Sequence, residues 1–505
     1  NFTDISAIKV APSNGNIIYV AYWGPTWGNP RLNKLLKTAN GGTTWIDISN
    51  NFSAYDWTYI SDFEIDPYNP NRVWASCAGY WPGSPPNEGQ GANRVVFSND
   101  GGLTWNDNSI GLPPIPVNCL VYQNGTDDVI YSGTDAGVYR WNKTIQAWEC
   151  FNNGFPASII TKLVIDNCKN KILASTFGRG IWEAPLPNTA EYHITTSQTW
   201  DAFYNRSFNN DVIVDYGVAF TIKGTLNFAG NKKLVIMPNA KLIIDGGKIT
   251  NGCGAQWQGI EVWGTTNQHQ YPVNGVCAQG SVELKNGAVI ENAYNGITNW
   301  KPDDWNSIGG IIIANNATFR NNRRSVEFMS YRNFDPATGV ETDNLSNFIN
   351  CSFEVNDAYP SGASPFVQMV SLWKVKGVTF AGCDFLNNRT NNFTGQAIGS
   401  LDAGYKILAL AGAPADRSFF KNFAYGIQAS NSQTVNSIYV DNAKFTSNGN
   451  GIDLTAINGA VIINSLFDIG TAPNCPNQGF GITTNSCSGY AIEQNTFTGS
   501  TAIPG

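Results

Sequence analysis

The residues that could carry out acid–base chemistry are few and scattered. Only 14% of the 505 residues are charged, and the two histidines are His193 and His269. Hydrolysis of a glycosidic bond needs two carboxylates that face each other across a cleft. The candidates Asp62, Asp66 and Asp135 each stand where a turn or a strand end would explain them. We therefore predict no catalytic residue, although a lyase that uses Lys or Arg as its base stays an open alternative.

Metal-binding patterns are also missing from the sequence. No Cys-x-x-Cys pair occurs and the two histidines are far apart, unlike the ligands of zinc sites. Asn-Gly turns such as Asn124-Gly125 lack the spaced aspartates of calcium loops, so a structural Ca²⁺ has no support. We expect neither a metal site nor a cofactor.

The ten cysteines favour disulfides instead. An even number of cysteines in a chain rich in Trp, Asn and Gly indicates an oxidising compartment, where disulfides form. Cys253 and Cys277 bracket an expected inserted loop, and Cys475 and Cys487 flank a Gly-rich turn. These two pairs are therefore candidate disulfides.

Two aromatic segments are candidate binding sites, because Pro and Gly restrict their backbone. Rigid aromatic rings can stack on a ligand at a low entropic cost, which suits the recognition of sugars. The alternative is that the tryptophans pack between neighbouring sheets. The candidate binding residues are Tyr22, Trp23, Trp27, Tyr80 and Trp81.

Composition and charge argue against two classes of partner. The 31 basic and 38 acidic residues give a net charge of −7, whereas proteins that bind the phosphate backbone carry clustered Lys and Arg. The longest apolar runs are far shorter than the ~20 residues that span a bilayer. We therefore expect no nucleic acid partner and no membrane span. Any export signal is expected to have been removed or to lie upstream.

The first third of the chain repeats one hairpin pattern. Residues 5–21 and 60–75 both consist of an alternating strand, a turn rich in Pro, Asn and Gly, and a second alternating strand. A third copy spans residues 117–133 and a fourth spans 160–175. Four units of this kind are typical of the blades of a β-propeller.

Two of these units share a second pattern, TANGGTTW at 38–45 and SNDGGLTW at 98–105. A short Asp or Asn side chain can bond its own turn, paired glycines permit positive φ, and the Trp buries a large ring. The pattern resembles the Asp-box of sialidase-type (BNR) β-propellers, which implies a structural role and no particular activity. Its residues here are Asn40, Gly42, Thr44, Trp45, Ser98, Asp100, Gly102, Thr104 and Trp105.

The remaining two-thirds of the chain has another repeat, with residues 185–200 predicted as a linker before it. Short strands alternate with Asn and Gly, and a module with an inward Phe recurs, as in Asn350-Cys351-Ser352-Phe353 and Gly382-Cys383-Asp384-Phe385. Stacked inward aromatics with Asn and Gly at the turns favour a right-handed parallel β-helix over residues 201–505. If Cys351 and Cys383 lie on adjacent coils, the ~4.8 Å spacing of strands brings them within reach of a disulfide.

The order of the two repeats, together with residues 257–264 (WQGIEVWG), resembles large secreted surface proteins of Bacteroidetes-type bacteria that use type IX secretion. The resemblance implies export, surface display and contact with the secretion or surface-anchoring machinery. Because four blades are fewer than most BNR-type propellers have, we expect residues 1–184 to be the C-terminal blades of a larger propeller, with the other blades upstream or on another chain, and the β-helix to continue beyond residue 505.

These observations predict an all-β, non-catalytic, secreted or cell-surface protein that is adhesin-like. Its propeller and β-helix would present faces to glycans or surface proteins. One alternative is a carbohydrate-active enzyme, either a propeller glycosidase or a β-helix polysaccharide lyase. Another is a subunit of a surface filament or of a secretion-associated complex.

Overall fold

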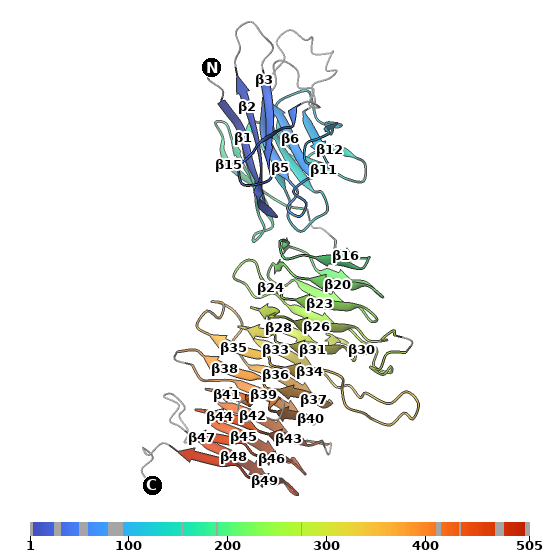
Figure 1. Cartoon of the computed structure of the whole chain (residues 1–505), viewed down its shortest axis with the longest axis vertical. Coiled ribbons are helices and arrows are strands. Elements are labelled where there is room, and N and C mark those ends of the chain that lie inside the picture. Colours follow the sequence, from blue (N-terminus) through green and yellow to red (C-terminus); the bar gives the residue numbers. More distant parts are fainter. Residues whose placement is uncertain are drawn as a thin grey trace. The chain divides into compact units, whose positions relative to one another are not determined.

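The computed structural model describes residues 4–24, 32–49, 59–78, 94–152, 155–187, 190–273, 275–390, 392–410, 416–433, 436–469 and 479–499. The chain forms two compact units, Asn1–Asn188 with Phe203–Asn209 and Thr189–Ala202 with Asn210–Gly505. Both units are built of strands, so the predicted all-β fold is confirmed (Figure 1). Across the described ranges there is no helix long and apolar enough to cross a bilayer.

The first unit is a series of antiparallel, blade-like sheets. Each of the four predicted repeat copies forms the first hairpin of one sheet, because the turn residues reverse the chain between two alternating strands. Within the described residues, three sheets have four strands and the last has three. The first two sheets are β1 (Asp4–Ala11), β2 (Asn14–Gly24), β3 (Leu32–Thr38), β4 (Ile46–Asp47), and β5 (Tyr59–Ile65), β6 (Val73–Ala78), β7 (Val95–Ser98), β8 (Asn106–Asp107). The next two are β9 (Val117–Tyr122), β10 (Ile130–Thr134), β11 (Gly137–Asn142), β12 (Ala147–Cys150), and β13 (Ile160–Asp166), β14 (Lys171–Thr176), β15 (Gly180–Pro185).

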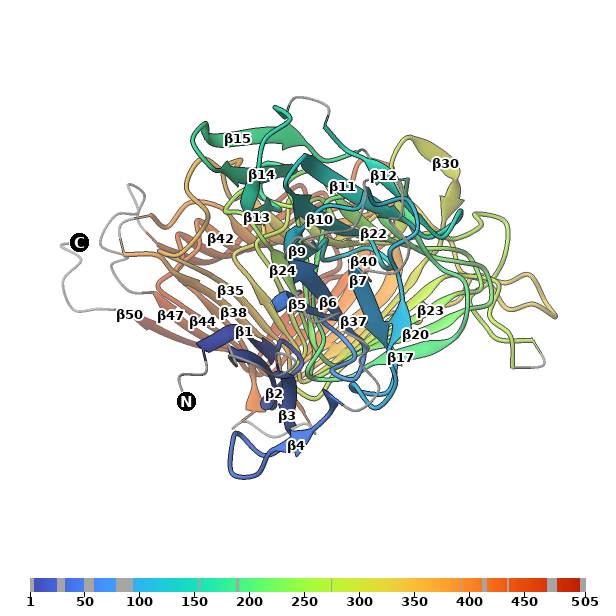
Figure 2. The same ribbon diagram turned by 90° about the horizontal axis from the view of Figure 1, so that it is seen from above.

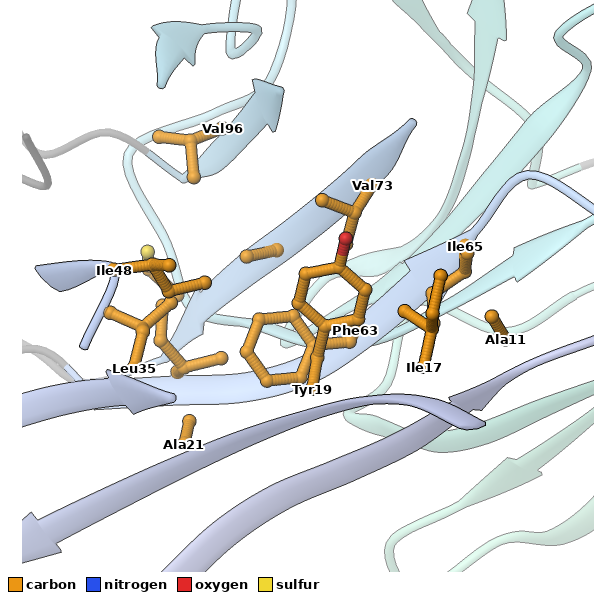
Figure 3. Close-up of a cluster of buried hydrophobic side chains, with 13 residues drawn as sticks. Ala11, Ile17, Tyr19, Ala21, Leu35, Ile48, Phe63, Ile65, Val73 and Val96 are labelled. Carbon is orange, nitrogen blue, oxygen red and sulfur yellow. The ribbon is translucent and has the colours of Figure 1, made fainter. Parts of the chain in front are cut away.

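The core of the first unit lies between neighbouring sheets. In the first of these layers Tyr19 from β2 meets Phe63 from β5, with ring centroids 6.0 Å apart (Figure 3). The ring of Trp74 stacks on Phe97 at 4.6 Å in the next layer. Each layer therefore has its own set of side chains, as expected of sheets that pack face to face.

The second unit is a parallel β-helix, which confirms the fold predicted for the C-terminal repeat. Its strands belong to three parallel sheets, each of eleven strands in the part of the chain described (Figure 1). Figure 2 looks along the stack, where strands of the second and third sheets lie on opposite sides of the view. Each coil contributes one strand to each sheet, so equivalent positions on successive coils become hydrogen-bonded neighbours.

The bounds of the β-helix strands are as follows. The first sheet, called sheet 1, consists of β16 (Tyr192–Ile194), β19 (Val212–Val214), β22 (Lys233–Ile236), β25 (Gly259–Val262), β28 (Asn295–Thr298), β33 (Arg324–Phe328), β36 (Gln368–Trp373), β39 (Gln396–Leu401), β42 (Tyr425–Ser430), β45 (Asn450–Thr455) and β48 (Phe480–Asn485). Sheet 2 consists of β17 (Gln198–Trp200), β20 (Ala219–Ile222), β23 (Lys241–Asp245), β26 (Ser281–Lys285), β31 (Ile311–Asn315), β34 (Asn347–Ile349), β37 (Lys376–Ala381), β40 (Gly404–Leu408), β43 (Ile438–Asp441), β46 (Val461–Ile463) and β49 (Ala491–Glu493). Sheet 3 consists of β18 (Asn205–Phe208), β21 (Thr225–Phe228), β24 (Lys248–Asn251), β27 (Val289–Glu291), β32 (Thr318–Arg320), β35 (Ser352–Asn356), β38 (Asp384–Asn388), β41 (Ser418–Lys421), β44 (Ala443–Thr446), β47 (Leu466–Ile469) and β50 (Thr496–Gly499). A small hairpin, β29 (Trp300–Lys301) and β30 (Asp304–Ile308), leaves the stack after β28.

A column of phenylalanines lies on the inner face of sheet 3. Successive rings are 4.6–4.9 Å apart and within 2–13° of parallel, as the recurring Phe module predicts. At the turns before these strands, Asn350 and Asn442 adopt positive φ values of 50° and 55°. Asn tolerates this conformation better than most residues, which explains its recurrence at the turns. The column consists of Phe319, Phe353, Phe385, Phe420, Phe445, Phe467 and Phe497.

The predicted linker 185–200 is wrong in part. β16 and β17 fall inside it and are the first strands of sheets 1 and 2, where they pair with β19 and β20. Ile194 and Trp200 are buried, so these short apolar segments join the core rather than connecting two bodies.

Candidate functional site

The structure describes two of the five predicted aromatic binding residues. Tyr22 and Trp23 lie on β2, half-buried, and the Trp23 ring is 5.8 Å from that of Tyr59. Trp27, Tyr80 and Trp81 lie outside the described residues. A role for these five residues in binding stays a prediction.

The two Asp-box-like turns share one hydrogen-bonding scheme. In the second turn the Thr104 amide donates to Asp100 Oδ1 at 2.9 Å, and the Gly102 amide donates to Ser98 Oγ at 2.8 Å. The Thr104 hydroxyl also donates to Asp100, which lowers the pKa of that exposed carboxyl to about 2. These contacts are internal to the turn, so they stabilise a local structure.

The first turn repeats these bonds with Asn in place of Asp. The Thr44 amide donates to Asn40 Oδ1 at 2.9 Å, and the Gly42 amide donates to Thr38 Oγ1 at 3.0 Å. The following tryptophans differ, because Trp105 packs against the core between the first two sheets whereas Trp45 is 41% exposed. The expected burial of the ring therefore fails at Trp45.

The cysteines depart from the predicted pairs. Cys168 and Cys253 are each in a disulfide-bonded state, but Cys277 is a free thiol that donates to the carbonyl oxygen of Gln270. Cys487 is also free, and its predicted partner Cys475 lies outside the described residues. The predicted pairings Cys253–Cys277 and Cys475–Cys487 are therefore wrong.

Cys351 and Cys383 do lie on adjacent coils, as their places in the module predict, because Ser352 pairs with Asp384. Both are nevertheless free thiols, so the predicted disulfide is wrong. Their sulfur atoms point to backbone carbonyls instead, that of Cys383 to Phe348 at 3.4 Å. Burial raises the pKa of the Cys383 thiol.

The candidate functional site is a polar hollow on the outer face of sheet 1. It has a volume of about 450 Å³, within the ~300–1,000 Å³ typical of ligand pockets. We call it the Gly399 hollow. Four consecutive coils build it through β36, β39, β42 and β45. Its lining residues are Gln368, Ser371, Leu372, Trp373, Gln396, Gly399, Ser400, Leu401, Gln428, Ala429, Ser430, Asp453 and Thr455.

Strand register lines up the polar residues of the hollow. Along one row, Ser371 pairs with Gly399, Gly399 with Gln428, and Gln428 with Asp453. The residues just before them on each strand, such as Ile398 and Ile427, are fully buried, since successive side chains of a strand alternate between faces. A second outward row passes from Trp373 through Leu401, Ser430 and Thr455.

A chain of side-chain hydrogen bonds links three coils of the hollow. Gln396 Nε2 donates to Gln428 Oε1, and Gln428 Nε2 donates to Asp453 Oδ2 at 3.2 Å. The Thr483 hydroxyl donates to the other oxygen of Asp453. The hydrogen bond to Gln428 fixes Gln396 Nε2, so the side-chain oxygen of Gln396 lies on the side of Gly399. Gln368 is 9% exposed, and no hydrogen bond joins its side-chain amide to another described residue.

Tryptophans extend the hollow on one side. The Trp373 ring lines it and lies 5.8 Å from that of Trp305, which is 54% exposed and 5.3 Å from Trp300. The hairpin β29–β30 carries Trp300 and Trp305, so an insertion between coils supplies this aromatic edge. Lys374 places its ammonium group 5.5 Å from the centroid of the Trp373 ring.

Two carboxylates occupy the same outward row nearer the start of the stack. Glu261 and Glu327 are separated by Thr298, so two strand spacings put them roughly 10 Å apart. Glu261 accepts two bonds from Lys233 Nζ at 3.0 Å. Arg324 forms an ion pair with Glu327, which also accepts the Thr298 hydroxyl at 3.1 Å. Both carboxylates are thus neutralised by a cation.

The other acidic candidates have structural partners. Asp66 accepts the amides of its own turn and forms an ion pair with Arg72 at 2.5 Å. Asp62 accepts the Leu120 amide at 3.1 Å, and Asp135 accepts the Asn118 side chain at 2.8 Å. Across the ranges that the structure describes, no group of three or more His, Cys, Asp or Glu side chains could hold a metal ion.

Sequence reasoning missed the Gly399 hollow. One signal could have found it, since the segments around Gly426-Ile427, Gly451-Ile452 and Gly481-Ile482 share a Gly-Ile pair followed by a polar residue. Aligning the coils on that pair places Gln428 and Asp453 in one outward row, as the structure does.

Comparisons with known proteins give partial structural likenesses. No protein-family model and no curated protein matches the chain. A crystal structure of the Niastella koreensis GH74 enzyme is 15% identical with a TM-score of 0.26, covering 34% of this chain and 26% of that one. An ancestral GH74 enzyme is 17% identical with a TM-score of 0.27, covering 36% of this chain and 25% of that one. The GH74 xyloglucanase from Xanthomonas campestris is 11% identical with a TM-score of 0.25, and 36% of each chain is covered.

Proposed function

We propose that this chain is a non-catalytic, glycan-binding part of a secreted or cell-surface protein and acts as an adhesin. The observation that carries the proposal is the Gly399 hollow with its tryptophan edge. Amide and hydroxyl groups line the hollow together with the ring of Trp373. The exposed indole of Trp305 is 5.8 Å from that ring and extends the aromatic surface. Recognition of a sugar needs this combination, since its hydroxyl groups require hydrogen bonds and its ring faces pack on aromatic side chains.

The state of the nearby carboxylates supports binding without hydrolysis. A general acid must hold a proton at the working pH, which usually requires burial without a cationic partner. Glu327 has the cationic partner Arg324, and Glu261 has Lys233 at 3.0 Å. Asp453 is held by Gln428 and Thr483. These carboxylates therefore serve as acceptors.

The disulfide-bonded state of Cys168 and Cys253 supports an extracellular location. Disulfides persist in oxidising compartments and are rare in the cytosol. An adhesin that displays its β-helix outside the cell would experience that environment.

The proposal is tested with a glycan array followed by titration of the best ligand. Trp305→Ala and Trp373→Ala should each weaken binding roughly tenfold, because they remove the aromatic edge. Tyr216→Ala is the matched control, since Tyr216 is 63% exposed in the same unit and does not line the hollow. Unchanged affinity in both tryptophan variants, or an array without any hit, would overturn the proposal.

One observation favours an enzyme as the second candidate function. Glu261 and Glu327 lie in one outward row with their backbones roughly 10 Å apart, and inverting glycosidases use two carboxyl groups ~6.5–9.5 Å apart. Incubation of the bound glycan with the protein separates the two functions. New reducing ends or unsaturated uronides that disappear in Glu327→Gln would establish catalysis and refute the non-catalytic proposal.

A further inference from the structure

We infer that the Gly399 hollow selects uncharged sugar units and rejects acidic ones such as uronates, sialic acids and sulfated sugars. The inference rests on the proposed glycan-binding function and names its ligand class. Three features of the hollow carry it: the absent side chain at Gly399, the orientation of two amide oxygens, and the sign of the charge in the lining.

Gly399 leaves room for two amide oxygens, because it has no side chain of its own. A Cβ atom at this position would lie closer than 3.0 Å to Gln396 Oε1 and to Gln368 Oε1. The residue lies within β39, and its φ is outside the left-handed range that glycine alone adopts readily. The backbone does not require glycine here, so what glycine provides is room for the two amide oxygens.

The two amide oxygens make this space a site for hydrogen-bond donors. Gln396 and Gln368 both place Oε1 over Gly399, and the hydrogen bond from Gln396 Nε2 to Gln428 fixes the first of them. A sugar hydroxyl can donate to such an oxygen, whereas a carboxylate or sulfate has only acceptors to offer. An acidic group in this position would face the fixed acceptor oxygen of Gln396 with no donor to offer it, which leaves both groups without partners.

The charge of the lining acts in the same direction. Asp453 lies in the hollow, and the described lining residues include no Lys, Arg or His. The ammonium group of Lys374 is held beside the Trp373 ring, and Lys374 is not one of the lining residues. Proteins that recognise carboxylates or sulfates present Arg or Lys in bonding geometry. Here an anion would instead meet the like charge of Asp453.

The test compares neutral and acidic glycans on one array, using the wild-type chain, Gly399→Val and Gln368→Leu. Valine suits a strand and would displace the two amide oxygens, so neutral binding should fall at least tenfold. Leucine at 368 keeps the volume and removes one acceptor, with a loss of roughly tenfold expected. Gly499→Val is the matched control, because Gly499 is also a strand glycine, on β50, and an added Cβ there meets no atom within 4 Å.

The outcomes separate this inference from the proposed function. Neutral hits that disappear in Gly399→Val and Gln368→Leu, with Gly499→Val unchanged and all melting temperatures retained, support the inference. Acidic hits that depend on Gly399 would overturn it and leave the glycan-binding function standing. Neutral hits that Gly399→Val and Gln368→Leu do not affect would also overturn it. Salt provides a second measurement, since affinity for a neutral ligand should be nearly constant between low and high ionic strength.

Discussion

The two units of this chain use aromatic residues in opposite ways. In the first unit each layer between sheets has its own aromatic pair, such as Tyr19 with Phe63 at an interplanar angle of 45° (Figure 3). In the β-helix one residue type recurs at one position, and Phe353 and Phe385 are within 4° of parallel. Antiparallel sheets that pack face to face need shapes that fit each interface, whereas parallel coils place equivalent residues directly above each other.

This difference also decides where a binding surface can form. The hydrogen-bonded turns of the first unit draw on a few consecutive residues, as in 98–105. The Gly399 hollow draws on residues from Gln368 to Thr455, because parallel register aligns strands that are distant in sequence. In a β-helix the outward residues of one row can therefore differ from coil to coil while the inward residues of the column stay the same.

The largest expected effect is on the phenylalanine column. Phe385 is fully buried between Phe353 at 4.7 Å and Phe420 at 4.6 Å, so Phe385→Ala removes both stacked contacts and leaves a cavity. We expect a loss of about 3–5 kcal/mol in the free energy of unfolding of the β-helix. Denaturant titration measures it.

The control for the column is Phe497→Ala, since this ring is 50% exposed and stacks on Phe467. It should cost much less than the change at Phe385. Equal losses at the two positions would show that burial between coils does not set the strength of the column, and the contrast between the two units would weaken accordingly.

A smaller effect is expected at the turns of the β-helix. Asn464 has a φ of 52° and its side-chain amide donates to Asp441 Oδ1 at 2.9 Å. Asn464→Ala should destabilise the β-helix by about 1 kcal/mol or more, because alanine is strained at positive φ and the bond is lost. Asn464→Gly should restore the conformational part of that loss. A glycine variant as unstable as the alanine variant would show that the bond to Asp441 dominates.

The sequence allowed the column and the sheets to be predicted, but not the hollow, and the reason lies in particular residues. The Phe module and the Asn turns recur in local patterns, so Phe353, Phe385 and their neighbours could be assigned inward positions without knowing any coil length. Gly399 is one of 51 glycines. Its place in the hollow can be recognised only together with Gln368, which lies one coil earlier. Insertions such as the β29–β30 hairpin change the coil length, so register cannot be counted along the chain.

The smallest expected effect concerns the paired turns of the first unit, where Asp100 and Asn40 occupy equivalent places. The Thr104 hydrogen bonds lower the pKa of Asp100 from 3.8 to about 2. A carboxyl whose pKa is lower in the folded state contributes stability above pH 3.8 and loses it as the pH falls toward about 2. Asn40 accepts the Thr44 amide in the same way and donates its own amide to the Thr44 hydroxyl, without a titrating group. Melting temperatures between pH 2 and 5 should therefore become less dependent on pH in Asp100→Asn and more dependent in Asn40→Asp. If neither slope changes, the bonds within the turn add nothing measurable, and the local contacts of the first unit would matter less than its layers between sheets.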